Sequence, residues 1–96
     1  YRIPSFNIQK YDINDHYKGE HCERDSILNN NRYFAWMIYL NDVKSGGKTC
    51  FPNQSIEISP KKGKALIWPS DWTHSHYASE VKSGEKFILT GWIERN

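Results

Sequence analysis

The stretch YFAWMIYL at residues 33–40 decides the fold class of this chain. It is dense in aromatic and branched side chains, which are enriched in β-strands. A polar segment that contains two glycines follows it and ends the apolar pattern. Residues 33–40 are therefore predicted to form a buried strand.

Shorter segments of the same kind lie on both sides of this stretch. Turns are expected where serine, proline and glycine cluster, at residues 44–47, 60–63 and 83–85. Strands are expected at residues 6–13, 49–51, 55–58, 65–68 and 87–93, with a further extended segment at residues 73–81. About seven strands with regular turns and no convincing helix predict a sandwich or an open barrel.

The composition limits the classes of protein that fit. The 96 residues suit one small domain with a modest core, and the first residue, Tyr1, indicates a trimmed or partial sequence. A net charge of +2 with acids and bases interspersed argues against binding to nucleic acid. No apolar run approaches the roughly 20 residues of a membrane span. Cys22 and Cys50 are too few for a disulfide framework, so we expect free thiols and a cytoplasmic location.

A candidate metal site consists of His21, Glu23 and His76. Alternate residues of a strand point to the same side, so His21 and Glu23 on an extended segment can reach one ion. Two imidazoles and one carboxylate are a known way to hold divalent iron while other positions stay open. An isolated His-x-Glu pair is more often solvated surface, but the distal histidine followed by Lys86 raises the set above chance.

Zinc is the rival metal, and six residues are its candidate ligands: His16, His21, Cys22, Cys50, His74 and His76. The chain has neither a Cys-x-x-Cys pair nor a helical His-x-x-x-His pair, which weakens the case for a structural zinc site. Asp25, two residues beyond Glu23, is a less favoured substitute for the carboxylate ligand.

Five blocks of the sequence, from Gln9 to Ile93, together resemble the catalytic core of the iron(II)- and 2-oxoglutarate-dependent dioxygenases, in their prolyl 4-hydroxylase-like branch. The blocks are Tyr11 through Tyr17 to His21-Cys22-Glu23; Arg32 through YLNDV at residues 39–43; GGKTCFP at residues 46–52; PKKGKAL at residues 60–66; and His76 through Val81, Gly84 and Lys86 to Trp92.

The resemblance implies an all-β core folded as a double-stranded β-helix, the jelly-roll or cupin-like arrangement, with few or no helices in residues 1–96. It assigns the iron ligands to His21, Glu23 and His76, and the spacing to Lys86 selects His76 over His74. The usual acidic ligand of the family is aspartate. Glu23 has one more methylene, so its carboxylate must fold back or the backbone must shift to keep a metal bond of roughly 2.0–2.2 Å.

The same resemblance places the co-substrate, 2-oxoglutarate. Lys86 would pair with its distal carboxylate at the bottom of an aromatic pocket. Tyr39 would donate to the same carboxylate, and Thr49 would add a hydroxyl. Tyr11 would line the pocket and Trp92 would form a wall, although the two tyrosines fit equally well as ordinary core aromatics.

The implied activity is hydroxylation of an unactivated C–H bond with Fe(II), 2-oxoglutarate and O2, with ascorbate as an optional addition. The branch implies a peptidyl proline, so a peptide or protein substrate is favoured over a small molecule. Residues 24–31 are expected to form a plain connection rather than a loop over the site. Two alternatives remain open: a β-barrel binding module without iron chemistry, and a zinc or nickel cupin-like enzyme without a dicarboxylate anchor.

Overall fold

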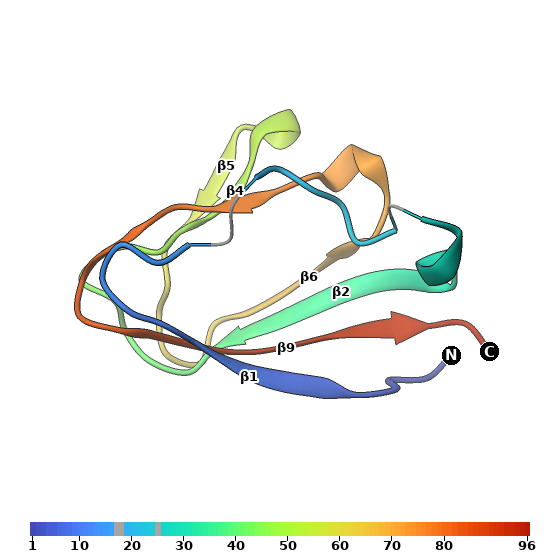
Figure 1. Ribbon diagram of the computed structural model, residues 1–96, viewed down its shortest axis with the longest axis horizontal. Coiled ribbons are helices and arrows are strands. Elements are labelled where there is room, and N and C mark those ends of the chain that lie inside the picture. Colours follow the sequence, from blue (N-terminus) through green and yellow to red (C-terminus); the bar gives the residue numbers. More distant parts are fainter. Residues whose placement is uncertain (17–18, 25) are drawn as a thin grey trace.

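The structure, a computed structural model, describes residues 1–16, 19–24 and 26–96. Tyr17 and Asp25, which the sequence interpretation includes, lie outside the described residues. Two layers of antiparallel strands face each other, and the two chain ends lie side by side (Figure 1). A bridge between Arg2 and Glu94 holds these ends together.

The larger layer is a four-stranded sheet in the order β1-β9-β2-β6. Its strands are β1 (Phe6–Tyr11), β2 (Arg32–Tyr39), β6 (Ala65–Pro69) and β9 (Lys86–Glu94). The stretch that decides the fold class is thus β2, which pairs with β6 on one side and β9 on the other. A strand with two neighbours satisfies its backbone groups on both edges, as expected for a buried apolar segment.

The smaller layer is a three-stranded sheet in the order β5-β4-β7, extended by the separate pair β3 and β8. These strands are β3 (Ser45–Gly46), β4 (Thr49–Phe51), β5 (Ile56–Ile58), β7 (Tyr77–Ala78) and β8 (Val81–Ser83). The helical turns in the described part of the chain are short 3-10 elements: η1 (Ile27–Asn29), η2 (Pro52–Gln54) and η3 (Trp72–His74). This arrangement confirms the double-stranded β-helix with few helices. The described residues contain no helix long and apolar enough to span a membrane.

Alternation along β9 positions the functional side chains. Lys86, Ile88, Thr90 and Trp92 occupy every second position, so they share the face that looks toward the smaller layer. The core lies between the layers, where Ala35, Phe51 and Trp68 are buried against each other. One strand therefore carries residues along the whole length of the space between the two layers.

Three local predictions are wrong. Residues 44–47 are not only a turn, because Ser45–Gly46 pairs with β8. Residues 73–81 are not one extended segment, because η3 covers Thr73 and His74 and the rest divides between β7 and β8. The first strand ends at Tyr11 rather than residue 13.

The backbone of Gly46 explains why part of this predicted turn is a strand. Its φ is +79°, and a Cβ at this position would lie 2.0 Å from the backbone oxygen of Glu80. Only glycine tolerates both the left-handed backbone and so close a neighbouring strand. Gly46 thus allows β3 to lie against β8, a pairing that the turn interpretation did not include.

Candidate metal centre and anion pocket

Backbone pairing brings His21 and His76 together across 55 residues of sequence. The His21 N–H donates to the His76 carbonyl at 2.9 Å, and the His76 N–H donates to the His21 carbonyl at 2.8 Å. Residues that exchange both hydrogen bonds lie directly opposite each other and project their side chains to the same face. The imidazole centroids are accordingly 4.3 Å apart.

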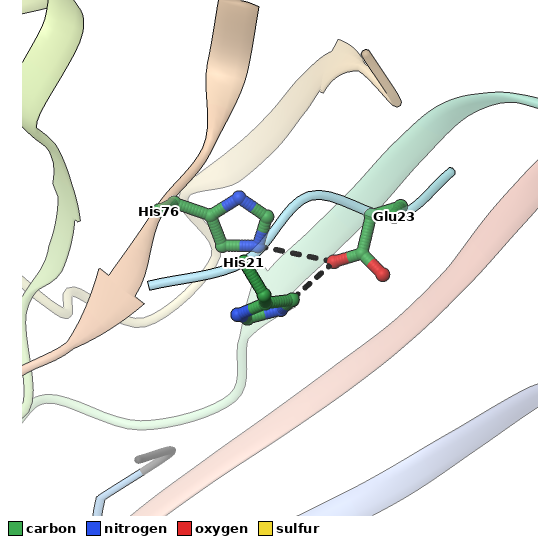
Figure 2. A group of neighbouring side chains, drawn as sticks. All are labelled: His21, Glu23 and His76. Carbon is green, nitrogen blue, oxygen red and sulfur yellow. Dashed lines mark hydrogen bonds and ion pairs between the residues drawn. The ribbon is translucent and has the colours of Figure 1, made fainter. Parts of the chain in front are cut away.

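Glu23 reaches the same point from a bend rather than from an extended strand. The next residue fixes this bend, because the Arg24 N–H donates to the Ser70 carbonyl at 3.0 Å and the Arg24 guanidinium pairs with Asp71. Oε1 of Glu23 lies 3.0 Å from Nε2 of His76 and 3.4 Å from Nε2 of His21 (Figure 2). The predicted convergence is present, although its predicted cause, an extended His-x-Glu strand, is wrong.

The orientation of the two rings suits a cation. Nδ1 of His76 lies 2.9 Å from the His74 carbonyl oxygen, and Nδ1 of His21 lies 3.4 Å from that of Gly19. A carbonyl oxygen only accepts, so a proton on Nδ1 of either ring donates to it and leaves the lone pair of Nε2 for a metal, whereas a proton on Nε2 donates to Glu23 when no metal is bound. Both Nε2 atoms and one carboxylate oxygen therefore face a single point, where a divalent cation would fit.

The spacing of these atoms fits a six-coordinate ion. Adjacent ligands at right angles, with bonds of about 2.1 Å, lie about 3.0 Å apart. The distance from Glu23 Oε1 to Nε2 of His76 equals this value at 3.0 Å, and the distance to Nε2 of His21 exceeds it slightly at 3.4 Å. All three candidate ligand atoms lie within 4.8 Å of one another. The longer side chain of glutamate therefore does not carry the carboxylate away from the site.

Aromatic packing and hydrogen bonds hold this centre in place. His76 is 5% exposed and lies between Phe51 and Trp68, with centroid distances of 5.4 and 5.0 Å. Burial alone would raise the pKa of Glu23, but hydrogen bonds from His21, His76 and Trp92 outweigh it and hold the pKa well below its usual range. The carboxylate is thus ionised, as a metal ligand must be.

Trp92 has a role that the sequence interpretation missed. It was assigned to the pocket wall, but its indole N–H donates to Oε2 of Glu23 at 3.0 Å. The two residues are 69 positions apart, so no local pattern indicates this hydrogen bond.

A cavity of about 100 Å³ connects this centre with the predicted co-substrate residues. Both layers and the segment that carries His21 and Glu23 contribute to its wall. The predicted site residues that line it are Tyr11, His21, Glu23, Thr49, His76 and Lys86.

Lys86 is an isolated cation in this cavity. Its side chain is 1% exposed, Nζ donates to the Gly47 carbonyl at 3.1 Å, and the ring of Tyr11, its partner in the β1–β9 register, lies 4.8 Å away. Among the described residues, no carboxylate lies within ion-pair distance of this ammonium. Burial lowers the pKa of Lys86 to about 8. Charge without a counter-ion is costly in a protein interior, which indicates a place for an anion.

Tyr39 and Thr49 form a pair at the back of the cavity. Tyr39 is fully buried, and its hydroxyl lies 2.5 Å from Oγ1 of Thr49. Thr49 lines the cavity, whereas Tyr39 is not among the lining residues. Burial raises the pKa of Tyr39, which keeps its hydroxyl a donor. Tyr39 therefore supports Thr49 from behind and does not face the cavity.

The zinc alternatives do not assemble in the structure. Cys22 and Cys50 are both free thiols, as predicted. Within residues 1–16, 19–24 and 26–96, the one group of three metal-binding side chains is His21, Glu23 and His76. His74 contributes its carbonyl to His76, while its own ring lies 3.0 Å from the Thr73 hydroxyl.

Comparisons with known proteins agree with this geometry. The model of the 2OG-Fe(II) oxygenase superfamily matches residues 6–94. Prolyl 4-hydroxylase subunit alpha-1 of Gallus gallus is 32% identical over 97 residues, which cover 94% of this chain and 17% of that protein. The chain thus spans about a sixth of the length of this curated relative.

Solved structures give the same result. The viral collagen prolyl hydroxylase of Paramecium Bursaria Chlorella virus-1, solved as a 2OG complex, superposes with a TM-score of 0.81 at 26% identity, over 98% of this chain and 63% of that one. A 2OG-Fe(II) oxygenase family oxidoreductase from Burkholderia pseudomallei gives a TM-score of 0.83 at 20% identity, over 99% of this chain and 44% of that one. At 20% identity, the similarity to the Burkholderia pseudomallei structure supports the fold alone.

Proposed function

Because this chain belongs to the 2OG-Fe(II) oxygenase superfamily, we propose that it forms the catalytic core of a dioxygenase that hydroxylates an unactivated C–H bond. His21, Glu23 and His76 would hold Fe(II), and Lys86 would bind 2-oxoglutarate. The observation that carries the proposal is one small cavity with a three-ligand metal set at one end and a buried lysine without a carboxylate partner among the described residues at the other.

The residues present fit the groups that the family uses. Two Nε2 atoms and Oε1 of Glu23 are the nitrogen and oxygen donors of a 2-His-1-carboxylate site, which leaves further positions open on the metal. The ammonium of Lys86 complements a carboxylate and recovers, on binding it, the interaction that burial removes. The iron, when bound, supplies the oxidative chemistry that couples decarboxylation of 2-oxoglutarate to hydroxylation.

The protein's own part is binding, orientation and exclusion of water. Phe51 and Trp68 pack on His76 and keep water from one side of the metal centre. Lys86 and the Thr49 hydroxyl, supported by Tyr39, would fix the far carboxylate of 2-oxoglutarate, so that its 2-oxo acid end points to the metal. Such fixed geometry is the contribution that a protein makes around a reactive cofactor.

The substrate proposed is a peptidyl proline. Two similar proteins, prolyl 4-hydroxylase subunit alpha-1 and the viral collagen prolyl hydroxylase, support this choice. Because the cavity volume is only about 100 Å³, such a peptide would lie across the mouth and extend a single side chain inward. A small-molecule substrate is the alternative outcome of the test below.

The test is turnover of the purified protein with Fe(II), 2-oxoglutarate, ascorbate, O2 and proline-rich peptides. We expect succinate in equal amount to peptide that has gained the mass of one oxygen atom at proline, and we expect neither with His76→Ala. Succinate without peptide oxidation would support the proposed oxygenase activity but would contradict peptidyl proline as the substrate. Bound metal and 2-oxoglutarate without any succinate would favour the alternative of a non-catalytic module.

A further inference from the structure

We propose that Trp92 is a positioning residue for the acidic metal ligand and that Arg32 holds Trp92 in this role. Together they make the longer side chain of glutamate suitable where the family usually has aspartate. This inference rests on the proposed metal site, and it concerns how Glu23 is oriented rather than which metal or co-substrate is bound.

The two oxygens of Glu23 have separate partners. Oε2 accepts the indole N–H of Trp92 at 3.0 Å, while Oε1 faces the imidazoles of His21 and His76. An indole N–H is a donor only and does not bind metals, so its partner oxygen is occupied without competition for the ion. The hydrogen bond therefore selects Oε1 as the metal-facing atom.

This selection matters more for glutamate than for aspartate. Glutamate has one more rotatable bond, so a freely rotating carboxylate loses more conformational freedom when it binds a metal. A hydrogen bond that already fixes the carboxylate before the metal arrives removes part of this cost. Partners of this kind, which contact a ligand but not the metal, are typically worth about 10- to 100-fold in metal affinity.

Arg32 braces both members of the pair. Its guanidinium carbon lies 3.9 Å from the centroid of the Trp92 ring, and Nη1 lies 3.5 Å from the main-chain oxygen of Glu23. Arg32 is on β2 and Trp92 is on the adjacent strand β9. One side chain of the rigid four-stranded sheet thus contacts the indole face and the backbone of the bend that carries the ligand.

The other tryptophans show that this hydrogen bond is not a general feature of the fold. The indole nitrogens of Trp36 and Trp68 are buried and have no hydrogen-bond partner among the described residues. Trp72 is 76% exposed. Trp92 is thus the tryptophan whose indole N–H meets a candidate ligand, within the part of the chain that the structure describes.

The main experiment measures Mn(II) affinity by anaerobic calorimetry in Trp92→Phe, with Trp36→Phe as the matched control on the same sheet. We expect Trp92→Phe to bind Mn(II) at least about tenfold more weakly, and Trp36→Phe to bind it like the wild type. Arg32→Leu, which leaves the aromatic core intact, should show a smaller loss in the same direction. Wild-type affinity in both Trp92→Phe and Arg32→Leu would overturn the proposal.

A second readout depends neither on metal affinity nor on activity. The indole N–H signals of the four tryptophans, assigned in ¹⁵N NMR spectra through Trp→Phe variants, report each hydrogen bond separately. The Trp92 signal should exchange slowly with water and shift in Glu23→Gln, and it should stay protected when diamagnetic Zn(II) is added. Rapid exchange of this signal would overturn the proposal, whereas a protected signal in a protein that binds no metal would reject only the proposed function.

Discussion

The two ends of the cavity hold their charged groups in opposite ways. At the metal end, Glu23 is met by His21, His76 and Trp92, and these partners hold its pKa well below the usual range despite burial. At the other end, Lys86 has a carbonyl and an aromatic ring as neighbours, and burial lowers its pKa to about 8. The first charge is stabilised by the protein, and the second is destabilised by it.

This difference indicates which end is complete before ligands bind. The metal end is preorganised, since its three donors already converge and are held by the backbone and by aromatic contacts. The end of the cavity at Lys86 lacks a counter-ion, because its buried ammonium has no carboxylate partner among the described residues and is left for an anionic ligand to neutralise. Destabilised groups of this kind are typical of binding sites, where function takes precedence over stability.

The largest expected effect is at the preorganised end. His76→Ala removes one of three ligands and should weaken divalent-metal binding by more than about 100-fold, beyond the effect of losing an indirect partner. His74→Ala is the matched control, because His74 offers its carbonyl and not its ring to the site. Anaerobic calorimetry with Mn(II) measures both. Equal losses in the two variants would mean that the structure identifies the wrong histidine.

The incomplete end should control the co-substrate and not the metal. Lys86→Ala removes a charge-assisted hydrogen bond worth about 1.5–3 kcal/mol, so 2-oxoglutarate affinity should fall by roughly 10- to 100-fold. Mn(II) affinity should stay at the wild-type value, because Lys86 is not a ligand. Calorimetric titration of 2-oxoglutarate into Mn(II)-loaded protein checks both statements, and unchanged 2-oxoglutarate affinity would remove Lys86 from the site.

The same lysine should lower stability when the cavity has no ligand. A pKa displaced from 10.5 to about 8 corresponds to at most about 3 kcal/mol, so Lys86→Met should raise the free energy of unfolding by up to this amount at pH 7. Between pH 8 and 10.5 the unfolded chain holds the proton that the folded protein releases, so the wild type gains stability and the difference fades. Urea denaturation of both proteins across this range tests the sign. If Lys86→Met were less stable than the wild type at pH 7, the conclusion that burial destabilises the Lys86 charge would be wrong.

The smallest effect is expected behind the cavity. Tyr39→Phe removes the hydroxyl that contacts Thr49 but no group that lines the cavity, so 2-oxoglutarate affinity should fall only a few-fold, about 1 kcal/mol. Thr49→Val is the partner variant and should have the larger effect, since Thr49 lines the cavity and Tyr39 does not. A loss with Tyr39→Phe as large as that with Lys86→Ala would mean that Tyr39 contacts the co-substrate directly.

Sequence reasoning located the strands where the pattern is strong. Residues 33–40 and 87–93 are apolar and branched over a full strand length, and both are strands with only small changes at their ends. It failed at residues 45–46 and 73–81, where glycine geometry and a short 3-10 turn decide the backbone. Such features depend on a neighbouring strand, and a single segment carries no signal for them.

The site residues were likewise predictable where the sequence carries the signal and not where contacts between distant segments decide. His21, Glu23, His76 and Lys86 were chosen by residue type and spacing, and the structure places all four around one cavity. The donor role of Trp92 was not predictable, because it depends on contact between residues 69 positions apart. The position of Tyr39 behind Thr49 depends likewise on the packing of two layers and not on spacing along the chain.

The most direct test of the account is anaerobic calorimetry of 2-oxoglutarate binding in four samples: wild type and Lys86→Met, each with and without Mn(II). The account predicts one site per chain with high affinity only in the metal-loaded wild type, because the dianion needs the metal at one end of the cavity and Lys86 at the other. Equal binding with and without metal, or equal binding by the wild type and Lys86→Met, would contradict it.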